Sequence, residues 1–273
     1  MHSLPSLRVT LPKRLDGKKV LIVGADGNLG PLWVESSLAE GATVFAVGLN
    51  ARSDSTLRKL GETYPNLIAA DIDISQDVAL ESLRSPLGDS GEVFALDGVI
   101  LNAGIDSLPG SGRESLEDYD RDEWEKIFSV NVFGIVGILN AVLPVLNNPS
   151  SVVMLGSLYG LVSPKPALYS HFNDGKGSLK HPAYGASKAA LVAIGKQYGT
   201  HLAPQGVRVN TLTLGGVAAG QDPEFVEKFE AHVPQGTMLA RDDLVGAMVF
   251  LLSDDSRAMT GQNVVVDGGF TAW

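Results

Sequence analysis

The chain has 273 residues and a formal net charge of −10, with 44% hydrophobic and 19% charged residues. That length suits one large α/β domain, and the acidic balance argues against nucleic acid or an anionic membrane surface as a partner, because no large basic field attracts phosphates. The absence of cysteine excludes disulfides, thiolate catalysis and cysteine-bound zinc, and we expect no metal site. No secretory signal is evident and no window approaches about 18 apolar residues, so we expect a soluble cytoplasmic protein.

Short apolar runs alternate along the chain with segments of helical periodicity. The predicted strands are Lys19–Val23, Ala42–Val47, Leu67–Ala70, Asp97–Leu101, Ser151–Leu155, Val207–Leu212 and Gln262–Val266. The predicted helices are Leu29–Glu40, Leu57–Thr63, a polar helix after Ser75, Arg121–Leu146, Tyr184–Leu202 and Asp242–Leu252. This alternation predicts parallel βαβ units. We therefore expect a single α/β domain of the Rossmann type over residues 1–273, a doubly wound parallel sheet of about seven strands with helices on both faces.

Two stretches interrupt the pattern. Residues 161–182 are polar and rich in Gly, Pro and His, and residues 217–237 form a long crossover. Long irregular segments in compact domains are often binding loops or lids. We predict an insertion near 161–182 and a lid-like segment near 217–237.

A glycine-rich turn follows the first predicted strand and precedes the first helix. Glycines allow a tight turn and close backbone approach to a pyrophosphate, while the helix N-terminus offers N–H groups. Strand, turn and helix together predict dinucleotide binding. The candidate residues are Gly24, Asp26, Gly27, Asn28, Leu29 and Gly30.

Tyr184 and Lys188 lie four positions apart, on one face of a predicted helix. A free tyrosine has a pKa of about 10 and is a poor base at neutral pH. A nearby ammonium, and the positive ring of an oxidised nicotinamide, would favour the phenolate. The pair is then suited to move the proton of a substrate alcohol or ketone during hydride transfer. Taken alone, however, this very common spacing favours an ordinary surface helix that happens to carry Tyr and Lys.

Taken together, these features resemble the short-chain dehydrogenase/reductase family over essentially the whole chain, from about Asp16 to Trp273. The Tyr-x-x-x-Lys motif corresponds to Tyr184 and Lys188, and the serine after the fifth strand to Ser157. The helix asparagine corresponds to Asn131. Further ordered matches are Asn102-Ala103-Gly104, Gly206-Val207-Arg208-Val209-Asn210 and Asp267-Gly268-Gly269.

The resemblance implies roles for these residues. Tyr184 would be the acid/base, and Ser157 would hydrogen-bond the substrate oxygen. Lys188 would hold the nicotinamide ribose and lower the pKa of Tyr184. Asn131 would position a water, although a structural, helix-bending role is the alternative. Tyr184, Lys188, Asn102, Ala103 and Gly104 would also contact the cofactor.

The sequence departs from the family pattern in three places. The glycines are spaced differently, and Asn28 stands at a usual glycine position. Leu214 replaces a proline before Gly215, yet Gly215 and Val217 could still contact the nicotinamide through their backbone. The stretch between Ser157 and Tyr184 is unusually long and carries Lys165, His171, Lys176, Lys180 and His181. A basic insertion suggests an anionic or polyhydroxyl substrate, with a solvated or oligomer-contact loop as the alternative.

Cofactor choice is expected at the end of the second strand, where an acid binds the ribose of NAD. Gly48 stands there, so the acid is missing. Asn50, Arg52 and Ser53 could hold a 2′-phosphate, and we therefore lean slightly to NADP over NAD. Asp73 and Ile74 resemble the adenine-contact motif, with Asp71-Ile72 as a rival.

The predicted function is NAD(P)-dependent interconversion of a secondary alcohol and a ketone. A weaker resemblance to members linked to flagellin modification and nonulosonic-acid pathways suggests a sugar or sugar-phosphate substrate. The alternatives are a 3-oxoacyl thioester reductase and a cofactor-binding scaffold with little turnover. The resemblance also implies a homo-oligomer, dimer or tetramer, packed through the glycine- and alanine-rich segments 133–141 and 186–195; packing of those segments on the sheet is the alternative.

Overall fold

The computed structural model describes residues 13–76, 83, 95–106, 120–172 and 178–273. Within them, seven parallel strands form one sheet in the order β3-β2-β1-β4-β5-β6-β7. The strands are β1 Lys19–Val23, β2 Thr43–Gly48, β3 Leu67–Asp71, β4 Leu96–Leu101, β5 Leu146–Ser157, β6 Val207–Leu214 and β7 Asn263–Val266. The expected doubly wound α/β fold is confirmed.

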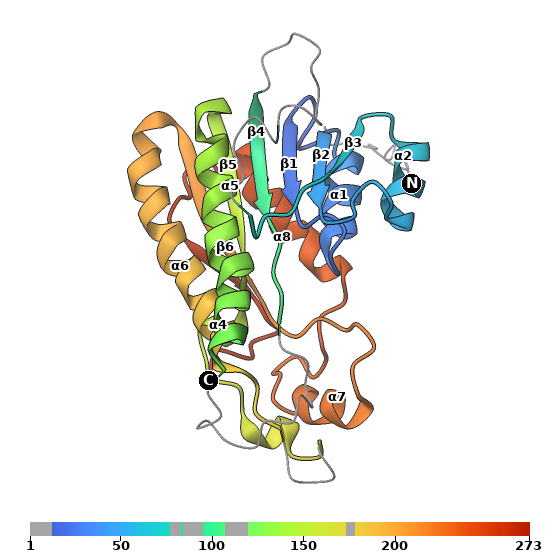
Figure 1. Ribbon diagram of the computed structural model, residues 1–273, viewed down its shortest axis with the longest axis vertical. Coiled ribbons are helices and arrows are strands. Elements are labelled where there is room, and N and C mark those ends of the chain that lie inside the picture. Colours follow the sequence, from blue (N-terminus) through green and yellow to red (C-terminus); the bar gives the residue numbers. More distant parts are fainter. Residues whose placement is uncertain (1–12, 77–82, 84–94, 107–119, 173–177) are drawn as a thin grey trace, which may run out of the picture.

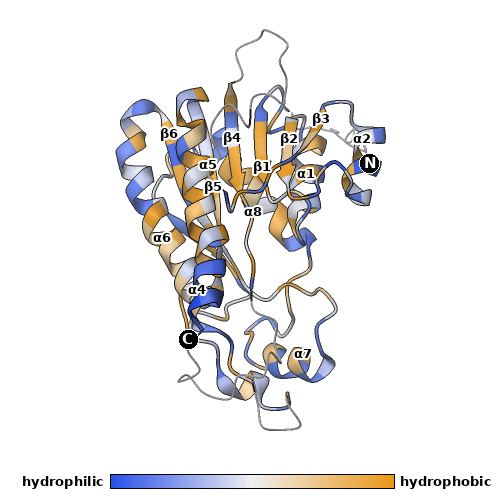
Figure 2. Cartoon of the chain, viewed as in Figure 1, coloured by the Kyte–Doolittle hydropathy of each residue, from blue (hydrophilic) through white to orange (hydrophobic). Residues whose placement is uncertain are grey.

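Helices cover both faces of the sheet (Figure 1). The helices are α1 Gly30–Ala39, α2 Ser55–Thr63, α4 Arg121–Phe128, α5 Ile135–Val142, α6 Pro182–Leu202, α7 Pro223–Glu230 and α8 Asp242–Leu252. One core joins α1, α2 and α8 to the sheet, and a second joins α5 and α6 to the opposite face. The central strands are mainly hydrophobic, which is typical of strands that are buried on both faces (Figure 2). The polar helix predicted after Ser75 falls almost entirely outside the described residues.

The predicted helix Arg121–Leu146 is helical as far as Val145, although not uniformly, and Leu146 already begins β5. A π-helical segment, Ser129–Gly134, separates α4 from α5. Gly134 packs so tightly that a Cβ there would lie 2.4 Å from the carbonyl oxygen of Ile74. Such π segments interrupt α-helices mostly at functional sites.

The stretch Arg121–Val145 is long and apolar enough, by composition, to cross a membrane. The expectation that no window approaches that character was therefore wrong. In this fold the stretch serves as a core helix, because Ile135, Ile138 and Val142 are fully buried against the sheet.

The predicted lid-like segment contains a helix, α7, which lies beyond the carboxyl ends of the strands (Figure 1). The insertion packs against it. Lys228 of α7 donates to the Ser170 hydroxyl at 3.0 Å, and His171 pairs with Asp222 at 2.9 Å. These contacts place the two irregular segments over one end of the sheet, where the cavity lies.

Candidate active site

A cavity of about 890 Å³ opens at the carboxyl ends of the strands. It lies where the strand order reverses between β1 and β4, the place at which open α/β sheets bind ligands. Its walls come from the ends of six strands, β1 to β6, and from the insertion and the lid-like segment. Of the predicted site residues, those that line it are Gly24, Asp26, Gly27, Asn28, Leu29, Asn50, Asp73, Ile74, Asn102, Ala103, Gly104, Ser157, Tyr184, Lys188, Gly215 and Val217. Gly30, Arg52 and Asn131 are not among them.

The glycine turn is built for close approach. Gly24 has φ 76°, and a Cβ there would lie 2.6 Å from Cα of Ala103. Gly30 is equally restricted, with the carbonyl oxygen of Ala25 2.3 Å from its Cβ position. Asn102 clamps the turn, because its amide donates to the Gly24 carbonyl at 2.8 Å and accepts from the Trp33 indole at 2.9 Å. A turn pinned this tightly at the start of α1, with Gly27 exposed to the cavity, fits a dinucleotide pyrophosphate.

Asn28, at the usual glycine position, has a definite partner. Its amide oxygen accepts a 2.7 Å hydrogen bond from the guanidinium of Arg241, just before α8. This brings a cation to the rim of the phosphate-binding turn. The two residues are 213 positions apart, so no local sequence signal could have shown it.

Of the residues expected to contact the adenosine half of the cofactor, some line the cavity and one does not. Asn50, Asp73 and Ile74 line the cavity, whereas the Nε of Arg52 points to the carbonyl of Ala69 at 3.4 Å. Val217 lines the other end, and its carbonyl already accepts from the Gln221 side chain at 2.7 Å. Any contact of Arg52 with a 2′-phosphate stays a prediction.

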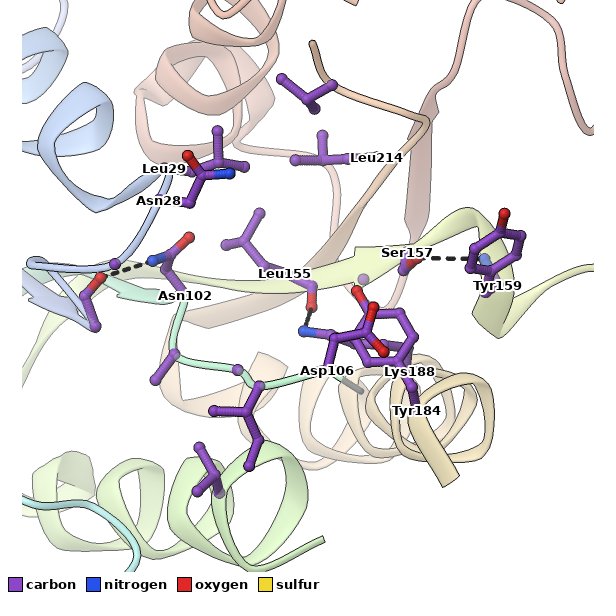
Figure 3. A pocket seen from close by; sticks show the side chains of 18 of the residues that line it. Asn28, Leu29, Asn102, Asp106, Leu155, Ser157, Tyr159, Tyr184, Lys188 and Leu214 are labelled. Atoms are coloured by element: carbon purple, nitrogen blue, oxygen red, sulfur yellow. Dashed lines mark hydrogen bonds between the residues drawn. The ribbon is translucent and has the colours of Figure 1, made fainter. Parts of the chain in front are cut away.

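Tyr184, Lys188 and Ser157 meet beneath the end of β5 (Figure 3). The helix α6 begins two residues earlier than expected, at Pro182. Lys188 donates to the carbonyl of Leu155 at 2.9 Å, and its ammonium lies 6.0 Å from the centre of the Tyr184 ring. The absence of a side chain at Gly104 makes room for this ammonium, which would lie 3.1 Å from a Cβ there.

Burial dominates the ionisation of this group. It raises the pKa of Tyr184 to about 12; the carboxylate of Asp106 acts in the same direction, and a hydrogen bond with Ser157 opposes both. Burial also lowers the pKa of Lys188 to about 8, opposed by Asp106. We expected Lys188 to lower the Tyr184 pKa, but the net shift in the protein is upward. The loss of hydration on burial of the phenolate raises the pKa more than the neighbouring groups lower it. At neutral pH the site holds a neutral phenol beside an ammonium.

Asn131 lies in the π-helical segment and is fully buried. Its amide oxygen accepts from the Ile105 N–H at 2.8 Å, and its nitrogen donates to the Ile105 carbonyl at 2.9 Å and the Ser187 hydroxyl at 3.0 Å. The side chain thus ties the exit of β4 to α6, behind Tyr184. This geometry favours the structural alternative for its side chain; the water contact stays a prediction.

Two charged residues beside Tyr184 lie outside the family motifs. Lys180, from the insertion, forms an ion pair with Asp106 and lies 5.1 Å from the Tyr184 ring centre. Its side chain is only 9% exposed. Of the other basic residues in the insertion, His171 faces the lid-like segment, Lys165 lies over Phe270, and Lys176 is outside the described residues. Among the described lysines of the insertion, only Lys180 lies beside the Tyr184 ring.

The rest of the cavity is largely apolar. The insertion and the lid-like segment contribute an aromatic wall, whose cavity-lining members are Tyr159, Tyr169, Phe172, Phe225, Phe229 and Met238. The hydroxyls of Tyr159 and Tyr169 bond to each other at 2.7 Å, so two polar groups of the wall satisfy one another. A ligand here would meet ring faces more than hydrogen-bonding groups.

A family model described as Enoyl-(Acyl carrier protein) reductase matches residues 25–271. The chain belongs to the short-chain dehydrogenase/reductase family. It is accordingly an NAD(P)-dependent oxidoreductase, as the order of motifs indicated.

Relatives in this family act on varied alcohols and ketones, to judge from their names. The chain is 29% identical to 3beta-hydroxysteroid dehydrogenase 1 of Eggerthella lenta, over 95% of each chain. It is 28% identical to meso-2,3-butanediol dehydrogenase of Serratia marcescens, over 95% of this chain and 96% of the relative. It is 25% identical to the rhamnolipids biosynthesis 3-oxoacyl-acyl-carrier-protein reductase of Pseudomonas aeruginosa, over 94% and 97%. These names do not single out one substrate.

Solved structures of family members carry either dinucleotide. A short-chain dehydrogenase from Leptospira borgpetersenii with bound NAD+ superposes with a TM-score of 0.81 at 25% identity, covering 99% of both chains. An active-site complex of Pseudomonas aeruginosa RhlG with NADP gives 0.80 at 25% identity, covering 95% of this chain and 99% of the other. The family thus accounts for NAD(P) use and leaves the preference open. The weaker resemblance to flagellin-modification members is not shown by these comparisons and stays a prediction.

Proposed function

We propose that the chain interconverts a secondary alcohol and a ketone carried on an apolar group, with Tyr184 as the proton donor and acceptor. The single observation that carries this proposal is the meeting of Ser157, Tyr184 and Lys188 at the inner end of an aromatic-walled cavity. When bound, NAD(P) supplies or takes the hydride. The glycine turn fits the dinucleotide at one end, which leaves the aromatic wall for the substrate.

The protein groups divide the remaining work. The Ser157 hydroxyl, at the end of β5, holds the substrate oxygen beside Tyr184. In the reductive direction the Tyr184 hydroxyl gives its proton to that oxygen, and in the oxidative direction the phenolate takes the alcohol proton. Lys188 is held by the Leu155 carbonyl and keeps positive charge next to the phenolate as it forms.

The aromatic wall favours an apolar substrate over a sugar. Phe172, Phe225 and Phe229 offer ring faces, which reward burial of apolar surface and leave sugar hydroxyls without partners. The sugar or sugar-phosphate prediction rests on the weaker resemblance and on the basic insertion. Among the described lysines of that insertion, only Lys180 lies beside Tyr184, and it is paired with Asp106. A 3-oxoacyl thioester is the second candidate, because an acyl chain would also suit this wall.

The proton-transfer role is tested with Tyr184→Phe. Turnover should fall by about a hundredfold or more with every substrate, while NAD(P)H binding, followed by fluorescence titration, stays within about twofold of wild type because no cofactor phosphate contact is touched. Wild-type turnover in the variant contradicts the mechanism. Failure of the wild-type enzyme to oxidise or reduce any compound in a broad panel favours the scaffold alternative.

The substrate class is tested with a panel of cyclohexanols, steroid alcohols, polyols and 3-oxoacyl thioesters. We expect the lowest KM for the bulky apolar alcohols and their ketones. Phe225→Ala should raise that KM about tenfold, with little effect on a short polyol. Trp273→Ala, which removes an exposed aromatic side chain outside the cavity, is the control. A polyol that is the best substrate and is insensitive to Phe225→Ala would exclude the apolar proposal.

We also propose a homo-oligomer that packs through the outer faces of α5 and α6. A Cβ at Gly137 of α5 would meet nothing within 4 Å, so that position faces outward, while Gly195 of α6 faces Thr211 on the sheet. Gly195 thus supports packing on the sheet, whereas Gly137 leaves the outer face of α5 open to the contact with a second copy that we propose. Gly137→Arg should reduce the mass measured by light scattering to that of a smaller assembly; an unchanged mass places the interface elsewhere.

A further inference from the structure

The end of β2 carries a carboxylate that does not belong to β2. Gly48 has no side chain, and a Cβ built there would lie 1.8 Å from Oδ1 and 2.5 Å from Cγ of Asp26. The carboxylate of Asp26, from the glycine turn, therefore fills the space that a side chain at position 48 would occupy.

The turn is fixed to β2 by its backbone. The N–H groups of Gly24 and Ala25 both donate to the carbonyl of Val47, at 2.8 and 2.9 Å. The N–H of Asn50 donates to Oδ2 of Asp26 at 2.7 Å. Asp26 is thus held at the strand end by both its backbone neighbours and its own side chain, and it lines the cavity.

This is the place where a dinucleotide-binding fold meets the adenosine ribose. An acid here accepts hydrogen bonds from the ribose hydroxyls of NAD, while NADP brings a 2′-phosphate to the same position. A carboxylate accepts from a hydroxyl but repels a phosphate dianion.

Compensating cations are lacking in the described lining of this end of the cavity. The residues that form it, Gly24, 26–29, 48–50 and 72–74, include neither lysine nor arginine. Arg52, which favoured NADP from the sequence alone, directs its Nε to the carbonyl of Ala69, and its backbone N–H binds Asp71. Arg241 reaches Asn28 at the other side of the turn.

We propose that Asp26 is the residue that selects the cofactor, replacing the missing acid at position 48 and giving a preference for NAD(H) over NADP(H). This reverses the slight lean to NADP drawn from the missing acid. The proposal uses only the binding of the dinucleotide, so it stands or falls independently of the catalytic role of Tyr184 and of the substrate class.

The test is an equilibrium titration of the purified protein with NADH and with NADPH, followed by nicotinamide fluorescence and by calorimetry. Wild type should bind NADH at least about tenfold more tightly, since a hydrogen bond to a charged group contributes on that order. Asp26→Asn keeps an oxygen for the Asn50 N–H, which preserves the turn, and should lower the NADH/NADPH affinity ratio about tenfold. Glu35→Gln, an exposed position on α1 that loses the same charge, is the control and should leave the ratio unchanged.

A second variant guards against indirect effects. Asp26→Gly combined with Gly48→Asp moves the acid to the strand itself and should restore the NADH preference that Asp26→Gly alone loses. Wild type that binds NADPH as tightly as NADH, or an Asp26→Asn protein that keeps the full preference, would overturn the proposal.

Discussion

We predict that the buried charge of Lys188 lowers the stability of the folded protein. The residue is 95% buried, and burial lowers its pKa from an ordinary 10.5 to about 8. A difference of about 2.5 in pKa corresponds to about 3 kcal/mol of unfavourable free energy for holding the charge in the folded protein. Lys188→Met removes the charge with little change in volume, although the Leu155 carbonyl loses its donor at a cost of about 1–2 kcal/mol. At neutral pH we expect the variant to be inactive yet about 1–2 kcal/mol more stable.

The pH dependence gives this prediction its sharpest form. The folded pKa lies below the unfolded one, so between pH 8 and 10.5 the unfolded chain binds more protons and the stability of wild type rises with pH. Below pH 8 both states carry the charge and the full penalty is present. The stability advantage of Lys188→Met should therefore shrink by about 2 kcal/mol from pH 7 to pH 9.5.

Urea unfolding of both proteins at pH 7 and pH 9.5, at one protein concentration, measures this change. Lys196→Met, an exposed lysine on the same helix, is the control and should show no comparable pH-dependent difference. A variant that is less stable than wild type at pH 7, with a gap that does not change with pH, would refute the reasoning.

Two further predictions concern the site and its support. In Asp106→Asn, the rate of alcohol oxidation should begin to rise at a lower pH than in wild type, because Asp106 is one cause of the raised Tyr184 pKa and its loss leaves the charge of Lys180 unneutralised. Profiles of kcat/KM against pH measure this shift, with exposed Asp255→Asn as the control. A shift to higher pH would contradict the role given to Asp106. Gly199→Ala should destabilise the protein by about 1–3 kcal/mol, since its Cβ would lie 2.5 Å from the Gly261 nitrogen. Gly61→Ala on α2, with open space at its Cβ, should instead stabilise by up to about 1 kcal/mol, and equal unfolding midpoints for the two variants would count against the packing argument.

The sheet could be read from the sequence because its strands are buried on both faces. A short apolar run such as Val20–Val23 indicates a buried parallel strand when helical segments alternate with it. The order of the motifs along the chain then indicated the family. The ends of elements were less predictable. β5 extends from Leu146 to Ser157, well beyond the predicted strand Ser151–Leu155, because Leu146 pairs with β4, and Ser150 and Ser157 pair with β6.

What the sequence could not supply was proximity between distant segments. Arg241 meets Asn28, Lys180 meets Asp106, and Asp26 fills the space above Gly48 only once the fold is formed. The sequence showed that no acid stands at position 48. The acid that we propose in its place, Asp26, comes from the glycine turn, and the residues of β2 alone give no sign of it. The same limit applies to the Tyr184 pKa, since burial is a property of the packed protein and not of a motif.

The charge arrangement around Tyr184 bears on the direction of the reaction. With a pKa of about 12, Tyr184 is a neutral phenol at neutral pH and already holds the proton that ketone reduction requires. Oxidation first needs the phenolate, which the buried site disfavours and which only added positive charge can stabilise. An oxidised nicotinamide ring carries such charge and a reduced one does not. Because Asp106 helps to raise the Tyr184 pKa, it favours the protonated phenol, which is the form that proton donation to a ketone oxygen needs.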